Sequence, residues 1–148
     1  MLTLLNEPSF IRNIADRGVR TLDEARKYIA ERMISSYEKF GFGLYLVLLK
    51  ENEASIGICG LVKRDVLDDV DIGYAFLPAY WSKGYATEAV IAIKKYAKNT
   101  VGLKRIAGVV APDNQGSIRV LEKAGLSYEK MVRLSADDIE IKFYATDF

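Results

Sequence analysis

A cluster of potential hydrogen-bond donors lies between Trp81 and Thr87, in the order Trp-Ser-Lys-Gly-Tyr-Ala-Thr. Gly84 opens a helical pattern there, because the apolar residues after it recur at spacings of three and four. The first N–H groups of a helix have no intrahelical partner, and the helix dipole adds positive character, so such a junction favours phosphate. Ser82 and Lys83 could add donors and charge, as could Thr87. An ordinary tight turn is the alternative interpretation.

The residue types rule out two well-known phosphate loops. The segment lacks the Gly-Lys-Ser/Thr ending and the glycine spacing of a Walker loop. It also lacks the fingerprint of a dinucleotide-binding turn, because Gly84 is the only glycine between Trp81 and Thr87. A ligand class therefore has to be inferred from a second segment.

The second segment follows an apolar run at 105–110. It reads Ala-Pro-Asp-Asn-Gln-Gly-Ser over 111–117 and Leu-Glu-Lys-Ala-Gly-Leu over 121–126. The two segments together resemble the Gcn5-related N-acetyltransferase (GNAT) superfamily, and Asn114 with Ser117 is similar to its second motif. The resemblance covers most of the chain from about Thr21 onward.

The first segment is similar to the pyrophosphate loop of this superfamily, usually written Gln/Arg-x-x-Gly-x-Gly/Ala. Gly84 and Ala86 match its small residues, and Trp81 stands in the Gln/Arg position. Tryptophan at that position resembles the branch of ribosomal-protein N-terminal acetyltransferases. The resemblance implies a single domain over 1–148 that moves an acetyl group from acetyl-coenzyme A to a primary amine.

Backbone groups would supply most contacts to acetyl-coenzyme A under this resemblance. The pyrophosphate would lie against Ser82, Lys83, Gly84, Tyr85, Ala86 and Thr87, with Trp81 at the mouth of the site. The pantetheine arm would pair like an extra strand with Ala75, Phe76 and Leu77, and the N–H near Leu77 would donate to the oxyanion. Asn114 would orient the arm or a water at the second junction.

Asp71 is the expected proton acceptor for the attacking amine, directly or through a water. The resemblance implies this role, because members of the branch often carry an acidic residue two positions before the strand glycine. Asp69 lies on the same strand face and is the reserve candidate. The alternative is that Asp71 belongs to a solvated acidic turn with Asp68 and Asp69.

The leaving thiolate also needs a proton donor, and many superfamily members use a tyrosine on the helix of the second motif. Leu121 occupies that position here, so Ser117 is the expected general acid. Helix capping by Asp113, Asn114 and Ser117 is the alternative interpretation. Tyr128 is a further acid candidate by residue type.

The composition narrows the class of protein. A net charge of +1 offers no field that would recruit nucleic acid or an anionic membrane, so the expected acceptor is a small-molecule or peptide amine. The sequence has no histidine, which excludes Ser–His catalysis and most zinc sites, and no metal is expected.

Cys59 lies in an apolar run and predicts a buried thiol in a cytoplasmic protein, which favours direct attack over an acetyl-cysteine intermediate. Both a monomer and a homodimer are compatible with the sequence.

The chain order predicts an α+β fold, with a mixed, mostly antiparallel twisted sheet and helices on both faces. A capping box at Thr21 begins a helix that ends near Gly41, with inward-facing Leu22, Ala25, Ile29, Met33 and Tyr37. Strands are expected over 44–50, 55–63, 71–77, 105–110, 128–135 and 139–146, and helices after Gly84 and Asn114.

The N-terminus departs from the superfamily pattern. Leu2–Pro8 predicts the end of a helix, whereas the resemblance implies a strand and most of a helix before this point. We expect a truncated chain, or one that lacks its first strand and leaves the next as a free edge. Two other functions stay open, namely a module that binds acetyl-coenzyme A without turnover and a partner-binding domain that uses this edge.

Overall fold

The computed structural model describes residues 1–148 and contains a sheet of six strands in the order β1-β2-β3-β4-β6-β5. The strands are β1 (Leu44–Leu48), β2 (Ser55–Val62), β3 (Asp71–Phe76), β4 (Arg105–Val110), β5 (Ser127–Val132) and β6 (Ile141–Asp147). All neighbouring pairs are antiparallel except β3 and β4, which run parallel. This arrangement confirms the predicted mixed, mostly antiparallel sheet.

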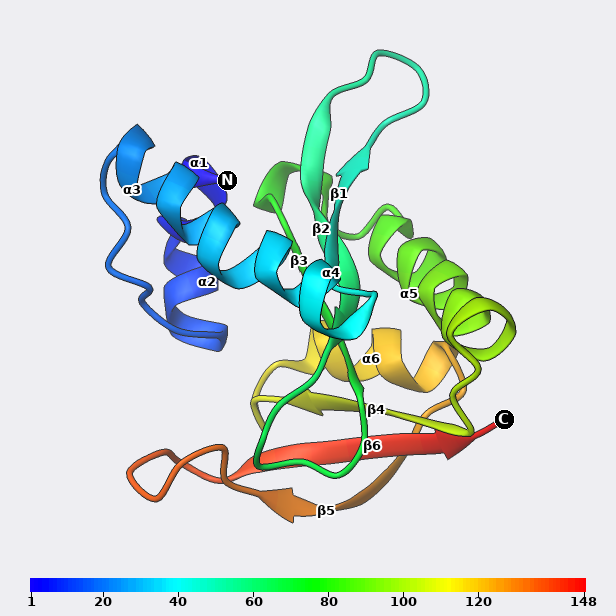
Figure 1. Ribbon diagram of the computed structural model, residues 1–148. Coiled ribbons are helices and arrows are strands. Elements are labelled where there is room, and N and C mark those ends of the chain that lie inside the picture. The colour runs from blue at the N-terminus through cyan, green and yellow to red at the C-terminus, as the bar shows by residue number, and fades with distance from the viewer.

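Helices cover both faces of the sheet, as predicted. They are α1 (Leu2–Leu5), α2 (Pro8–Asn13), α3 (Leu22–Tyr28), α4 (Ser35–Phe40), α5 (Tyr85–Tyr96) and α6 (Gln115–Lys123). A π-helical segment at Ile29–Ile34 joins α3 to α4, and another at Ala97–Val101 extends α5. Figure 1 shows α1 to α4 on one side of the β1–β3 strands and α5 with α6 on the other.

Two apolar clusters hold these helices to opposite faces. Ile72 of β3 joins Val90 of α5 and Leu121 of α6 in the larger cluster. Ile58 of β2 lies in the second cluster, with Met33 and other buried residues of the N-terminal helices. Complete burial of an aliphatic side chain of this size contributes about 1.5–3 kcal/mol to stability. Alternation along the strands therefore sends one set of side chains to each helical layer.

Two details of the N-terminal half differ from the sequence-based predictions. Thr21 caps α3 in a reciprocal capping box, as expected. Leu22, however, is 64% exposed, because it is the first residue of α3 and lies at the end of the stripe that buries Ala25 and Met33. Pro8 is expected to end a helix, but it also begins one. It lies in the first turn of α2, where its missing N–H leaves no hydrogen bond unmade.

β1 forms one edge of the sheet and pairs only with β2, so the predicted free edge is present. Leu46 and Leu48 on this strand are exposed. None of the helices has the length and apolar character needed to cross a membrane.

The sheet opens between β3 and β4. These strands share a single register pair, Asp71 with Ala107, and the Ala107 N–H donates to the Val70 carbonyl oxygen at 3.0 Å. Figure 1 shows β3 continuing beside β1 and β2, whereas β4 runs in another direction with β6 and β5. The β3–β4 gap, as we call this opening, leaves part of the β3 edge without a neighbouring strand.

Candidate active site

The backbone of β3 presents alternate residues to β2 and to the β3–β4 gap. The Leu77 N–H donates to the Ile56 carbonyl oxygen at 2.9 Å, which fixes the phase of the antiparallel ladder. In that phase the N–H and C=O of Ala75 point toward β2. The backbone groups of Tyr74 and Phe76 point the other way and line the gap.

This alternation corrects two sequence-based expectations. Ala75 and Leu77 are not available to a pantetheine arm in the gap, because the Ala75 backbone and the Leu77 N–H belong to the ladder with β2. The Leu77 N–H is likewise not free for an oxyanion. Only Phe76 of the three expected residues faces the gap, and its carbonyl oxygen accepts the indole N–H of Trp81 at 2.8 Å. Trp81, which is 45% exposed, thereby ties the loop to the end of β3.

The loop from β3 into α5 contains two residues with left-handed backbone, Ser82 with φ 58° and Gly84 with φ 85°. A Cβ at Gly84 would meet no atom within 4 Å, so the glycine satisfies the backbone conformation and leaves open space before the helix. No side chain caps α5. The N–H groups of Tyr85, Ala86 and Thr87 in its first turn are therefore available to an anion.

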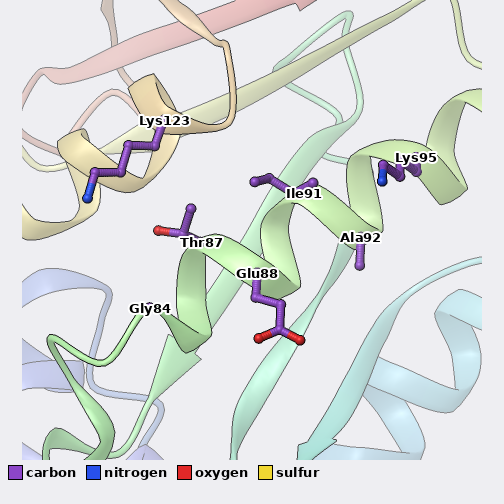
Figure 2. Close-up of a pocket in the computed structure, with 7 residues that line it drawn as sticks. All are labelled: Gly84, Thr87, Glu88, Ile91, Ala92, Lys95 and Lys123. Carbon is purple, nitrogen blue, oxygen red and sulfur yellow. The ribbon is translucent and has the colours of Figure 1, made fainter.

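A cleft of about 590 Å³ continues from this turn along α5 toward α6. Its lining consists of Gly84, Thr87, Glu88, Ile91, Ala92, Lys95 and Lys123. Figure 2 shows Thr87 on the side of α5 that faces Lys123, whereas Glu88 points the other way. Lys95 and Lys123 supply positive charge here, and sequence reasoning missed both. Lys123 lies within the Leu-Glu-Lys segment of the second motif, but only the fold brings it beside α5.

The start of α6 faces β3 from the far side of the gap. Asn114 caps this helix, because its Oδ1 accepts from the Ser117 N–H at 3.2 Å, and the capping interpretation is correct for this residue. The Ser117 side chain has a different partner. Its Oγ lies 2.6 Å from Tyr74 Oη, and the Tyr74 hydroxyl lies 3.2 Å from the Ser117 carbonyl oxygen. Tyr74 and Ser117 therefore link β3 to α6.

Sequence reasoning assigned no chemical role to Tyr74. Its side chain lies on the same strand face as Ile72 and packs against the larger core cluster. Burial raises the pKa of Tyr74 to about 12, although the hydrogen bond with Ser117 acts in the opposite direction. The phenol is therefore protonated at neutral pH and able to donate. Strand alternation predicts only a core tyrosine here, because the contact with Ser117 spans 43 residues of sequence.

Cys59 lies opposite Tyr74 in the register of β2 and β3 and is 2% exposed. Burial raises the pKa of its thiol to about 12. The sulfur is therefore protonated at neutral pH and shielded from solvent, which is a poor arrangement for a nucleophile. The prediction of a buried structural cysteine is confirmed.

Asp71 is only 1% exposed, so the alternative of a solvated acidic turn is wrong for this residue. Its Oδ1 accepts from Arg64 Nε at 3.1 Å. Burial raises the pKa of Asp71, and the nearby Arg64 guanidinium opposes that increase. Alternation places its side chain on the opposite strand face from Tyr74. The carboxylate lies where β3 leaves β4, and its burial leaves no room for direct contact with a bulky acceptor.

Asp69, the reserve candidate, pairs with Arg105, whose Nε donates to Asp69 Oδ2 at 3.1 Å. Arg105 also donates to Glu129 and Asp147, and its hydrogen bonds to these carboxylates raise its pKa. Asp69 is thus committed to a structural network. Tyr128 lies on β5, which β6 and β4 separate from the gap, so it is not placed to act as an acid there.

A sequence profile of the acetyltransferase (GNAT) domain matches residues 1–127. This chain belongs to the GNAT acetyltransferase family. YkkB, an uncharacterised protein of Bacillus subtilis, is 34% identical over 132 residues, which cover 88% of this GNAT chain and 75% of YkkB. Two further B. subtilis relatives carry the name N-acetyltransferase, and the matches span 63% of their own lengths.

Solved structures share the fold of this GNAT domain. An acetyltransferase of the GNAT family from Bacillus anthracis superposes with a TM-score of 0.78 at 26% identity, over 97% of this chain and 84% of that one. A spermidine N-acetyltransferase from Vibrio cholerae, in complex with coenzyme A and spermine, superposes with a TM-score of 0.78 at 15% identity, over 98% and 86%. The second likeness concerns the fold alone.

The fold of this GNAT domain separates the expected site residues into two groups. The loop after Trp81 and the end of α6 lie on one side, joined by the cleft that Thr87 and Lys123 share. Ser117, in the first turn of α6, lies on the same side and is hydrogen-bonded to Tyr74, whose backbone lines the gap. Asp71 lies on the opposite face of β3, at the closed end of the gap.

Proposed function

We propose that this GNAT protein transfers an acetyl group from acetyl-coenzyme A to a primary amine, by direct attack of the amine on the thioester. The opening of the sheet carries the proposal, because the free backbone edge of β3 leads toward the uncapped first turn of α5. A donor with a peptide-like arm and a pyrophosphate suits these two features together. The buried, protonated Cys59 supports direct attack over an acetyl-cysteine intermediate.

Each part of the donor has a counterpart among the residues present. The pyrophosphate would accept hydrogen bonds from the N–H groups of the loop at 82–87, where the helix dipole is positive. The nucleotide end, which carries one further phosphate on its ribose, would extend along the cleft toward Lys95 and Lys123. The pantetheine amides would pair with Tyr74 and Phe76. We assign the oxyanion contact to the Phe76 N–H, which takes the place of the Leu77 N–H.

The amine has to lose a proton before it can attack, since α-amines are protonated below about pH 8 and lysine amines below about pH 10.4. We assign proton acceptance to Asp71 through a water, because the buried carboxylate is not open to the acceptor itself. Its raised pKa makes it a stronger base than an exposed aspartate. Arg64 would return it to the ionised form after each turnover.

The acceptor in this proposal is a primary amine of a small molecule or a peptide. Trp81 at the head of the loop supports the narrower assignment to the ribosomal-protein N-terminal acetyltransferase branch, for which the acceptor would be a protein N-terminus. Spermine in the V. cholerae structure supports a polyamine as the competing acceptor class. A panel that contains both kinds of amine separates the two assignments.

One observation favours a second function, the binding of acetyl-coenzyme A without turnover. Leu121 stands where many superfamily members carry the tyrosine acid, and it is fully buried against Gly108. Calorimetric titration with acetyl-coenzyme A, followed by thiol release on the same sample, distinguishes the functions. Thiol release that depends on an amine supports the enzyme. Binding without release for any amine tested would favour the binding module instead.

A further inference from the structure

We propose that Tyr74 positions the Ser117 hydroxyl so that it donates a hydrogen bond to the sulfur that leaves acetyl-coenzyme A. The inference rests on the proposed function and adds to it a residue that neither sequence motif contains. Ser117 is the catalytic residue in this account, because it would touch the reacting sulfur. Tyr74 is a positioning residue, because it acts through Ser117.

The geometry places the two hydroxyls where a leaving group in the gap would meet them. Tyr74 belongs to the strand whose free edge lines the gap, and Ser117 belongs to the first turn of α6 on the other side. Their oxygens are 2.6 Å apart, which is a short hydrogen bond between hydroxyl groups. The Tyr74 ring packs against the core, so its hydroxyl is held by the surrounding side chains.

The two hydroxyls share two hydrogens, and two arrangements satisfy the distances. In one, Ser117 donates to Tyr74 Oη, and Tyr74 donates to the Ser117 carbonyl oxygen 3.2 Å away. In the other, Tyr74 donates to Ser117 Oγ, and the Ser117 hydrogen is free for a third group. A sulfur that gains negative charge in the gap favours the second arrangement, because it attracts that hydrogen.

The transfer reaction needs this donor at one step. As the amine attacks, a carbon–nitrogen bond forms, the carbon–sulfur bond breaks, and its electron pair stays on the sulfur. The amine proton passes through water to Asp71 and then to solvent, and the thiolate takes a proton from solvent after it leaves. Ser117 keeps its own proton throughout and stabilises the thiolate by a hydrogen bond, so the atoms and charges balance.

The surroundings of Tyr74 keep it in the donating form. Burial holds its pKa at about 12, far above neutral pH. Cys59, which faces it across the β2–β3 register, is also protonated and carries no charge that would attract the phenol hydrogen. Ser117 therefore offers the oxygens that the phenol can reach, and its side-chain oxygen is the nearer of the two.

The test is a titration of the thiol of coenzyme A bound to the protein, followed by thiolate absorbance. A hydrogen bond from Ser117 stabilises the thiolate and lowers the thiol pKa below its ordinary value of about 8.5. We expect the thiolate fraction at neutral pH to be about tenfold larger in the wild type than in Tyr74→Phe or Ser117→Ala. Tyr144→Phe is the matched control, because Tyr144 is buried on β6 at 3% exposure, away from the gap.

Kinetics give a second readout that a merely structural role would not produce. Tyr74→Phe and Ser117→Ala should each lower kcat about tenfold, with the KM for acetyl-coenzyme A changed by less than about twofold. The double variant should be no slower than Ser117→Ala, because Tyr74 acts only through Ser117. Ser117→Thr keeps the hydroxyl and should restore most of the rate.

The outcomes separate this inference from the proposed function. An unchanged thiol pKa in Tyr74→Phe, or losses of rate that multiply in the double variant, would overturn the inference while the enzyme assignment stands. A wild type that binds coenzyme A but never releases thiol would overturn the enzyme assignment, and the thiol titration would still decide the role of Tyr74. A protein that binds no coenzyme A would overturn both.

Discussion

Tyr74 Oη and Ser117 Oγ lie 2.6 Å apart, and this contact joins residues that are 43 positions apart in the sequence. Tyr74 comes from the strand before the β3–β4 gap, and Ser117 from the helix that follows the strand beyond it. A donor that pairs with the Tyr74 backbone would lie next to this pair of hydroxyls. The relationship connects the binding surface of β3 to the chemistry that we assign to α6.

Gly84→Arg should abolish acetyl-coenzyme A binding and leave the fold intact. The φ of 85° makes a non-glycine residue cost about 1 kcal/mol, and the arginine side chain would fill the space assigned to the pyrophosphate. Calorimetric titration measures the affinity, and thermal melting followed by circular dichroism measures the fold. Gly102→Arg is the matched control, because Gly102 has φ 80° and open space but follows α5. Undiminished affinity in Gly84→Arg would contradict the loop assignment.

Lys123→Gln should weaken acetyl-coenzyme A binding by about three- to tenfold and flatten its dependence on salt concentration. The change removes one positive charge from the cleft beside α5 and keeps a side chain of similar length. Titrations at low and high salt provide the measurement. Lys98→Gln serves as the control, because Lys98 lies on the extension of α5 and does not line the cleft. Equal losses in both variants would argue against a nucleotide in the cleft.

Cys59→Ala should retain turnover, because direct attack requires no thiol nucleophile. The substitution removes a buried sulfur next to Tyr74, so a modest loss of thermal stability is expected. Mass spectrometry after incubation with acetyl-coenzyme A alone provides the measurement. The wild type should gain no acetyl group on Cys59, whose thiol pKa of about 12 keeps it unreactive. An acetylated Cys59 that disappears when amine is added would show a two-step route instead.

Asp71 should make the stability of the protein depend on pH in a defined direction. Burial raises the pKa of Asp71 in the folded state, so the folded chain binds this proton more tightly than the unfolded chain. The free energy of unfolding of the wild type, relative to Asp71→Asn, should rise as pH falls through the raised pKa toward about 3.9. Urea unfolding of both proteins across this range gives the comparison. A relative fall on acidification would mean that Arg64 outweighs burial.

Asp71→Asn should also lower kcat/KM and remove the contribution of the carboxylate to the limb of the pH profile on which the rate falls with acidification, whereas protonation of the amine still contributes to that limb. The amide cannot accept the proton that the amine loses. Asp69→Asn is the matched variant, because Asp69 pairs with Arg105 and has no assigned role in catalysis. Initial rates across pH for both variants provide the measurement. A normal profile in Asp71→Asn would reduce the role of this residue to its ion pair.

Local features of the fold could be predicted because each depends on neighbours in the chain. The capping box at Thr21 and the glycine turn that opens the helix at Gly84 follow short patterns of residue type, and both are present. The apolar runs likewise gave each strand to within a few residues. The error over Ala75 and Leu77 has a physical cause, because a strand alternates with a period of two. The sequence of β3 does not show which of its backbone groups face β2 and which face the β3–β4 gap.

The contacts that complete the candidate site could not be predicted, because they depend on how distant elements pack. The sequence predicts a proton acceptor at Asp71, with a solvated acidic turn as the alternative, and only its burial beside Arg64 shows an ion pair. Lys123 joins the cleft because α6 packs beside α5. Tyr74 and Ser117 share no motif. A single sequence holds the residues of the site but not the pairings between them.

The most direct test of acetyl transfer is to mix the protein with acetyl-coenzyme A and a panel of peptide N-termini, polyamines and antibiotic amines. Free thiol and the mass of each amine are followed together. We predict that at least one amine gains an acetyl group in step with thiol release, and that Gly84→Arg shows neither. A wild type that binds acetyl-coenzyme A yet releases no thiol above the amine-free rate would contradict the account.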